Sequence, residues 1–391
     1  MTSIKYHKRR SYKSALVERP RIPIAAPSIN DEDVAAVSSA VSSGWISGRG
    51  KYVNDFELRF GHWLGSSNVV ACSSGTSALH LGLLAAGVKR DDEVIIPTFS
   101  MGAIPFSVSY LGAKQVLVDS ERETWNMDVS QISDRITSKT KAIVAMHTYG
   151  HPVNLAPLVK LCQEHGIKLI EDAAEAHGAE FEGKKVGTIG DIGCFSFFAN
   201  KIITTGEGGA VITRSDADAE KCRSLRDMSF SKDPSQKFLH ASIGFNYRLT
   251  NMQAALGYSQ LGRIDKFIST RRRNAKLYDS MLGNIRGITT PQEAKWAKNV
   301  YWMYSILVDA KNFGKSRDAL MIELSRAGIE TRPFFVPIHR QPVYSSYHVK
   351  ESYPIADKLS GEGLNLPSGN TLTEDEVRYV ADTLISLSGK S

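Results

Sequence analysis

The sequence alternates short, strongly apolar runs with longer amphipathic or glycine-punctuated stretches, and this alternation limits the possible folds more than any other feature. Seven runs have the length and composition of strands, and long connections separate the first five. Most are too apolar to leave one face in water, so we expect a mostly parallel seven-stranded sheet with helices on both faces, an α/β fold. The runs are 69–72, 93–97, 116–119, 142–146, 168–171, 192–197 and 208–213.

The last two runs are joined by only about ten residues, which is too short for a helical crossover between parallel strands. We therefore expect one antiparallel pair there.

After residue 250 the pattern changes to a helical stretch, and we predict a large domain over 22–250 followed by a linking helix and a smaller α+β domain over 251–391. The elements predicted after the boundary are a helix over 251–282, a strand over 301–308, a helix over 316–327, a loop over 332–342 and a helix capped by Thr373.

The charge of the chain is unevenly distributed. The net charge of the 391 residues is +7, but residues 1–21 hold seven Lys or Arg residues and one Glu, so the rest is nearly neutral. This pattern predicts a solvated, mobile basic arm over 1–21 that the chemistry does not need, and a body that does not bind nucleic acid.

Composition also excludes several classes of protein. With 42% hydrophobic and 23% charged residues the chain is typical of globular proteins, and no apolar run is long enough to span a membrane. The N-terminus lacks the apolar core of a secretory signal. The four cysteines are far apart and form no CxxC pair, so we expect neither disulfides nor a metal site, and a cytoplasmic location.

Lys201 is the strongest candidate for a catalytic residue. It lies between two strongly apolar runs, after Ser196 and before the glycine-rich segment 204–209, TTGEGG. Burial lowers the pKa of an amine and makes it a nucleophile toward aldehydes. A lysine in this context therefore indicates covalent catalysis, although lone lysines at strand ends are usually surface residues.

Two further segments end strands at the same predicted edge of the sheet. In 73–87, Gly75 would let a phosphate approach the main chain at a helix start, where Thr76 and Ser77 add donors; an ordinary helix cap is the alternative. In 168–179, Asp172 follows an apolar strand and is followed by two alanines. An unpaired buried carboxylate is costly, so we expect a cationic partner for Asp172 unless it only caps a helix.

These motifs and the segment 244–257, GFNYRLTNMQAALG, resemble in order and spacing the DegT/DnrJ/EryC1/StrS family of pyridoxal-phosphate-dependent sugar aminotransferases. The resemblance covers residues 22–391, and 44–52 and 123–128 are most similar to its GDP-perosamine synthase branch. It implies the fold type I, aspartate-aminotransferase-like architecture. It also implies pyridoxal 5'-phosphate as cofactor, with pyridoxamine 5'-phosphate as intermediate, and a homodimer with shared active sites.

The resemblance also implies roles for single residues. Lys201 would hold the cofactor covalently and later carry a proton, and Asp172 would pair with its protonated ring nitrogen. Asn246 would reach the cofactor's phosphate from the neighbouring subunit. The remaining phosphate contacts would come from Ser196 and the amides of Gly75, Thr76 and Ser77.

At two positions the chain departs from the commoner family pattern. Met101 stands where many members stack an aromatic ring on the cofactor, and a thioether is a weaker stacking partner. Glu175 replaces a common Gln, as in the perosamine branch, and we expect its pKa to be raised beside the cofactor's phenolic oxygen. Lys201 itself favours transamination, because relatives that remove oxygen from sugars carry His there.

Substrate contacts are the least constrained feature. Trp45, Arg248 and His339 are candidates, with a loop anchor, a salt-bridge partner and a capped turn residue as the respective structural alternatives. Arg248 also suits a carboxylate of the amino donor.

The function implied is transfer of an amino group from L-glutamate to a keto group, at carbon four, of a nucleotide-linked deoxysugar such as GDP-4-keto-6-deoxymannose, for surface polysaccharide and O-antigen synthesis. The alternatives are a dTDP- or UDP-linked sugar, carbon three, or a catalytically silent relative with a binding role.

Overall fold

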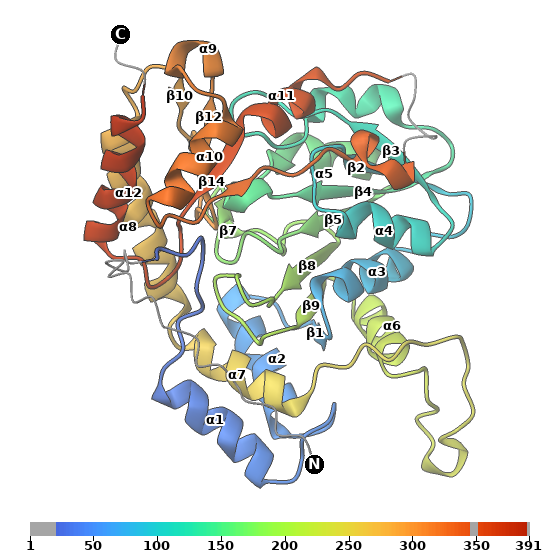
Figure 1. The fold of residues 1–391 in the computed structure, drawn as a ribbon. Coiled ribbons are helices and arrows are strands. Elements are labelled where there is room, and N and C mark those ends of the chain that lie inside the picture. The colour runs from blue at the N-terminus through green and yellow to red at the C-terminus, as the bar shows by residue number, and fades with distance from the viewer. Residues whose placement is uncertain (1–20, 345–350, 389–391) are drawn as a thin grey trace, which may run out of the picture.

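The computed structural model describes residues 21–344 and 351–388, and a seven-stranded sheet forms its centre (Figure 1). The strand order is β1-β9-β8-β5-β4-β2-β3, and β9, the neighbour of β1 and β8, runs antiparallel to both. The predicted α/β fold and the antiparallel pair are therefore confirmed. The strands are β1 (Val69–Cys72), β2 (Glu93–Pro97), β3 (Lys114–Val118), β4 (Thr140–Met146), β5 (Lys168–Asp172), β8 (Ile192–Ser196) and β9 (Gly209–Thr213).

Helices cover both faces of this sheet, and the alternation of side chains along β8 shows how. Cys194 faces α3 (Gly75–Ala85), since a Cβ at Gly82 would lie 3.2 Å from its sulfur. The next residue, Phe195, faces the opposite side and meets Phe60 of α2 (Lys51–Leu64) with ring centroids 5.2 Å apart. Successive side chains of a strand point to opposite faces, so both faces are buried.

The remaining helices continue these two layers and extend into the C-terminal part. α4 packs on α3, α6 on α3, β9 and β1, and α7 on α1 and α2. The bounds are α1 (Asp31–Ser42), α4 (Ala103–Tyr110), α5 (Leu155–His165), α6 (Asp216–Arg226), α7 (Asn251–Leu261), α8 (Ile264–Leu282), α9 (Ala310–Phe313), α10 (Arg317–Arg326), α11 (Pro354–Glu362) and α12 (Glu374–Ser386).

A second, four-stranded antiparallel sheet lies in the C-terminal part, in the order β10-β12-β14-β13. A separate apolar core lies there, and α8 reaches both cores, with Phe267 in the first and Tyr278 in the second. The two-domain division at residue 250 stays a prediction. The strands are β10 (Ile288–Thr289), β12 (Tyr304–Val308), β13 (Arg332–Pro333) and β14 (Gly363–Leu366); a small third sheet joins β6 (Glu180–Phe181), β7 (Lys184–Lys185) and β11 (Ala297–Lys298).

Two predicted elements differ from the structure at their ends. The helix expected over 251–282 is two helices, because α7 ends at Leu261 with Gly262 as its cap, and α8 starts after Arg263, whose backbone is not helical. The strand expected over 301–308 begins at Tyr304, since Tyr301 has a positive φ of 48°. The predicted cap at Thr373 is present, with Thr373 and Glu376 forming a capping box at the start of α12.

The described chain begins at Arg21, the last residue of the predicted basic arm. Nearly all of the basic arm predicted over 1–21 lies outside the described residues, and Ile22 is already buried in the second core. Among the described residues we find no helix long and apolar enough to cross a membrane.

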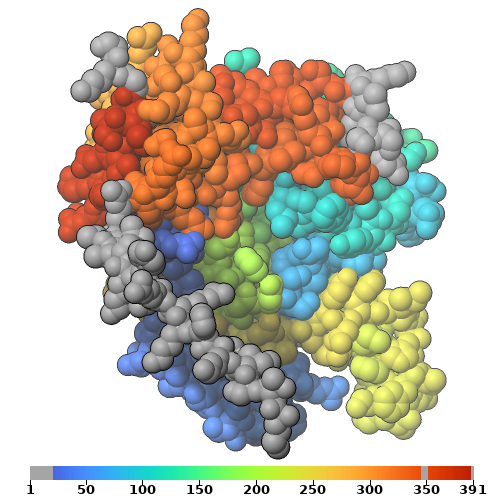
Figure 2. Space-filling view, in the orientation of Figure 1, coloured from blue at the N-terminus to red at the C-terminus, as the bar shows by residue number. Residues whose placement is uncertain are grey.

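Figure 2 shows the green segment around residue 200 set back between the orange and red C-terminal part and the blue N-terminal part.

The contact of α2 with β8 gives a prediction about stability. Phe60 is fully buried against Phe195 and Phe197, so Phe60→Ala should lower the free energy of unfolding by about 3–5 kcal/mol, measured by urea denaturation. Leu58 is on the same helix but 73% exposed, and Leu58→Ala should change it by less than about 0.5 kcal/mol. Equal losses in both variants would contradict this packing.

Candidate functional site

The start of α3 forms a small cradle beside the end of β8. Ser74 caps the helix: its hydroxyl accepts from the amide of Ser77 at 3.1 Å, and Ser77 Oγ accepts from the amide of Ser74 at 2.9 Å. Both polar groups of Ser77 are therefore engaged in the cap. In the described chain the amides of Gly75 and Thr76 have no such partner, so they are the donors left for an anion.

Ser196, the last residue of β8, lies across this cradle from Gly75. A Cβ at Gly75 would come within 2.8 Å of the Ser196 Cβ, so only glycine leaves room between them. Ser196 is buried, and its oxygen accepts from the amide of Phe198 at 3.3 Å, which leaves the hydroxyl proton to be donated. The free amides, the hydroxyl and the positive end of α3 fit a phosphate group.

The amine of Lys201 lies in a nearly closed pocket between an aromatic ring and a carboxylate. Its Nζ is 3.7 Å from the centroid of the Trp302 ring and 3.8 Å from Oε1 of Glu175. Burial lowers the pKa of Lys201, while the charges of Glu175 and Asp172 oppose that shift. The lowered pKa favours the neutral, nucleophilic form of the amine.

Glu175 is buried and shares the pocket with that amine. Its Oε2 accepts a hydrogen bond from the amide of Tyr149 at 2.9 Å. Burial raises the pKa of Glu175 to about 7, although the nearby charge of Lys201 lowers it. The pKa of Glu175 is thus raised by burial, whereas the effect that we expected from the cofactor's phenolic oxygen stays a prediction.

Asp172 ends β5 on the same face of the sheet as α3. Its register partner on β8 is Cys194, which faces α3, so the two side chains share that face. Its Oδ1 accepts from the amide of Ala174 at 3.0 Å, and no other hydrogen bond to its carboxylate is found among the described residues. Burial raises the pKa of Asp172, so the carboxylate needs a cationic partner, as a protonated ring nitrogen would be.

Glu171, the residue before Asp172, has a structural role. It points to the other face, where its carboxylate accepts from the amides of Gly187, Ile189 and Gly190 and lies 3.1 Å from His147 Nε2. These bonds satisfy the buried charge. Of the two adjacent carboxylates, only Asp172 therefore faces the pocket.

Sequence reasoning missed two residues that shape this pocket. Trp302 places its ring against Lys201, and its Nε1 donates to the carbonyl of Asn200 at 2.9 Å. Tyr149, with a φ of 51°, donates its amide to Glu175 and packs on Phe335. Tyr149's strained backbone has no sequence signal, and Trp302 lies 101 positions after Lys201 in an apolar run typical of core.

Of the three predicted substrate-contacting residues, two have their polar groups engaged within the chain. Arg248 pairs with Asp227 at 2.7 Å, as its structural alternative expected. Both ring nitrogens of His339 are bonded, Nδ1 to Thr98 at 2.8 Å and Nε2 to Asp357 at 3.0 Å. Trp45 differs, because its side chain is exposed while its carbonyl accepts from Asn251.

Met101 and Asn246 lie at the surface of the single chain. Met101 is half exposed, and its sulfur lies 3.1 Å from the amide of Ala103. Asn246 is exposed and forms a β-bridge with Asp227, and no bond joins it to Lys201 or Ser196 in the described structure. Their roles toward the cofactor stay predictions.

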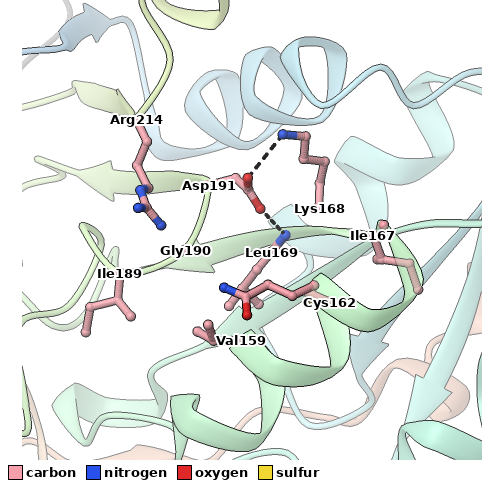
Figure 3. A pocket seen from close by; sticks show the side chains of 11 residues that line it. Val159, Cys162, Ile167, Lys168, Leu169, Ile189, Gly190, Asp191 and Arg214 are labelled. Atoms are coloured by element: carbon pink, nitrogen blue, oxygen red, sulfur yellow. Dashed lines mark hydrogen bonds and ion pairs between the residues drawn. The ribbon is translucent and has the colours of Figure 1, made fainter.

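A hollow at the opposite edge of the sheet contrasts with this pocket. Figure 3 shows Asp191 there, where its carboxylate pairs with Lys168 at 3.1 Å and accepts from the amide of Leu169 at 2.9 Å. The hollow, of about 240 Å³, lies at the start of the parallel strands, and neither Lys201 nor Gly75 and Ser196 of the phosphate cradle line it. The candidate site is therefore at the carboxyl edge, where α/β sheets bind ligands.

Comparison with known proteins agrees with this geometry. The family described as the DegT/DnrJ/EryC1/StrS aminotransferase family matches residues 27–385. Proteins named GDP-perosamine synthase are similar: that of Escherichia coli O157:H7 is 40% identical over 93% of this chain and 97% of its own, and that of Vibrio cholerae is 39% identical over 93% and 98%.

Solved structures are similar along nearly the whole chain. DesV of S. venezuelae, solved with a ketimine intermediate, has a TM-score of 0.88 and 30% identity and covers 95% of this chain and 100% of its own. PseC of Helicobacter pylori has a TM-score of 0.89 and 27% identity over 94% and 99%. The chain therefore belongs to the DegT/DnrJ/EryC1/StrS aminotransferase family and is a pyridoxal-phosphate-dependent aminotransferase.

Proposed function

We propose that this enzyme transfers the amino group of L-glutamate to the keto group at carbon four of a GDP-linked deoxysugar such as GDP-4-keto-6-deoxymannose. The products are 2-oxoglutarate and the GDP-linked 4-amino sugar, so the exchange of an amine for a carbonyl oxygen balances without any redox partner. Such a product serves surface polysaccharide synthesis.

The observation that carries the proposal is the identity of 39–40% to three proteins named GDP-perosamine synthase over 93% of this chain. Relatives with other names are less similar, such as EryC1 of Saccharopolyspora erythraea at 35% and SpsC of Bacillus subtilis at 31%. The proposal assigns transamination to Lys201, Asp172 and Glu175; it is supported by the 3.8 Å between Lys201 Nζ and Glu175 and by the influence of the Asp172 charge on the pKa of Lys201. We infer that the chain shares both the reaction and the nucleotide preference of the perosamine group.

The positions of the side chains around Lys201 suggest separate roles for the cofactor and for each residue. When bound, the cofactor supplies an aldehyde that takes up the donor's nitrogen and a ring that withdraws electrons. Lys201 contributes the amine that holds the cofactor and, once released, accepts and returns a proton at Nζ. Trp302 and Glu175 keep that amine in place and exclude water.

Two carboxyl groups act in different protonation states. Asp172 acts as an anion, because it pairs with a positive ring nitrogen and so keeps the ring electron-withdrawing. Glu175, whose pKa is raised by burial to about 7, is suited to share a proton with an oxygen of the ring. The different surroundings of the two carboxyl groups thus suit Asp172 to act as an anion and Glu175 to carry a proton.

We also propose that the enzyme works as a homodimer with shared active sites. Residues 228–246 form a strap that projects from the body (Figure 1) and ends in Asn246. Phe238, Leu239 and Ile243 of the strap are 63–88% exposed, and a cluster of exposed apolar side chains is typical of an interface. A partner seated there would bring Asn246 toward the other subunit's phosphate cradle.

A panel of acceptor sugars tests the substrate. With L-glutamate as donor, we expect GDP-4-keto-6-deoxymannose to be aminated with kcat/KM at least about 100-fold above dTDP- and UDP-linked 4-keto sugars, since several base contacts of about 1 kcal/mol each are lost with the wrong nucleotide. Mass spectrometry measures turnover, and NMR of the product identifies the aminated carbon. An amine at carbon three, or preference for another nucleotide, would overturn the corresponding part of the proposal.

Complementation tests the shared site. Lys201→Ala and Asn246→Asp should each be inactive, the second because a carboxylate would face the phosphate. Mixed under conditions of subunit exchange they should regain about a quarter of wild-type activity, because half of the dimers are then mixed and each contains one intact site. If exchange is confirmed by native mass spectrometry and activity does not return, the site is not shared.

The raised pKa of Glu175 predicts a pH dependence of stability in the protein freed of cofactor. Folded Glu175 retains its proton up to about pH 7, while the unfolded chain releases it near its ordinary pKa of 4.5. Its stabilising contribution is therefore complete below about pH 4.5 and is lost as the pH rises through about 7. Thermal or urea unfolding should show the wild type losing stability relative to Glu175→Gln between pH 5 and 8; a constant difference would contradict the assignment.

A further inference from the structure

A buried arginine occupies an apolar position of α8. Phe267 and Tyr278 lie on the buried face of this helix, and Arg271, one turn after Phe267, is on the same face and only 3% exposed. Burial lowers the pKa of its guanidinium to about 9, and no carboxylate pairs with it in residues 21–344 and 351–388. A buried cation without an acidic partner lowers the stability of a fold, so core packing alone does not explain this residue.

The guanidinium of Arg271 binds two acceptors beside the lysine pocket. Its Nη1 donates to the carbonyl of Trp302 at 2.5 Å, and its Nε donates to Oδ1 of Asn370, in the turn after β14, at 2.6 Å. The ring of this same Trp302 lies against the Lys201 amine. One arginine therefore connects the ring over the amine with Asn370.

Trp302 and Asn370 in turn bind the main chain on either side of Lys201. Nε1 of Trp302 donates to the carbonyl of Asn200 at 2.9 Å, and Nδ2 of Asn370 donates to the carbonyl of Ile202 at 2.8 Å. Residues 200 and 202 flank the lysine. The four hydrogen bonds that Arg271, Trp302 and Asn370 donate thus form a bracket around it.

The lysine needs such support because its own segment is irregular. Lys201 belongs to no helix or strand and lies between β8 and β9. Its amide donates to the carbonyl of Phe198 at 3.0 Å, and this is the only main-chain hydrogen bond of Lys201 among the described residues. The place of its main chain therefore depends on bonds from other parts of the protein.

We propose that Arg271 and Asn370 are positioning residues for Lys201, which hold the lysine segment and the Trp302 ring in one arrangement. In a transamination the amine must leave the cofactor, carry a proton and return to the same place. A displacement of about 1 Å is enough to slow such steps strongly, so a fixed main chain on both sides of the lysine favours turnover. The inference rests on the catalytic role proposed for Lys201 and not on the identity of the sugar.

The test measures the reactivity of Lys201 in the cofactor-free protein. Acetic anhydride labels neutral amines, and mass spectrometry of the Lys201 peptide gives the labelling rate constant at each pH. In Asn370→Asp the rate constant at high pH should rise about 3- to 10-fold, the scale of one lost hydrogen bond, because the donor to Ile202 is removed. Urea unfolding should show that this variant is not less stable than the wild type, since its carboxylate still accepts from Arg271.

Arg271→Met removes the guanidinium and both of its bonds, so the labelling rate constant should rise at least as much as in Asn370→Asp. The pH midpoint of labelling should move upward, because burial and the charge of Arg271 both lower the pKa of Lys201. The matched control is Arg317→Met on α10, whose side chain is 13% exposed and donates to the carbonyls of Ser360 and Gly363. It should leave the labelling of Lys201 unchanged.

Activity of the cofactor-loaded enzyme gives a second measurement. In Asn370→Asp and Arg271→Met, kcat should fall about 3- to 10-fold while KM for the acceptor sugar changes less than about twofold. Unchanged labelling of Lys201 in both variants, or an equal rise in Arg317→Met, would overturn the proposal. If borohydride reduction joins the cofactor to another lysine, the role proposed for Lys201 fails, whereas raised labelling of Lys201 would still support the bracket.

Discussion

The enclosure of one amine is the interaction on which the rest of this structure depends. Lys201 is held between the ring of Trp302 and the carboxylate of Glu175, out of contact with most of the solvent. Burial costs a cation much of its hydration free energy, and this loss is what shifts the amine toward its reactive neutral form. The reactivity that we propose for Lys201 therefore depends on packing, since opening the pocket to water would raise the pKa of the amine again.

That enclosure requires parts of the chain that are far apart in sequence. Glu175 follows β5, Lys201 lies between β8 and β9, and Trp302 precedes β12 of the second sheet. Trp302 is fixed twice, by its own bond to Asn200 and by the bond that its carbonyl accepts from Arg271 of α8. The pocket is thus built from residues of both sheets. A shift of the second sheet against the first would change the surroundings of the Lys201 amine.

Local pattern was enough to predict the central sheet and the residues at strand ends. β1 and β2 have the predicted bounds, because each is a short apolar run between turn residues. Asp172 and Lys201 were singled out from their places beside such runs, whereas the phosphate-binding role of Ser196 came from the family resemblance, and these roles stay predictions. Trp302 and Tyr149 were out of reach, since Trp302 meets Lys201 across more than 100 positions and Tyr149 has a strained backbone. The break at Gly262 was missed because the apolar spacing continues on both sides of it.

The two neighbouring carboxylates of β5 have a consequence for how the chain finds its register. The Glu171 carboxylate accepts from three amides of the loop 187–190, while among residues 21–344 and 351–388 the Asp172 carboxylate, on the other face, accepts from one amide. A slip of β5 by one residue would exchange the faces of these side chains and deprive the loop of its acceptor. The hydrogen bonds of Glu171 thus favour this register of β5 over a shifted one: the interactions that stabilise the loop also keep the Asp172 carboxylate on the face of the sheet that carries α3.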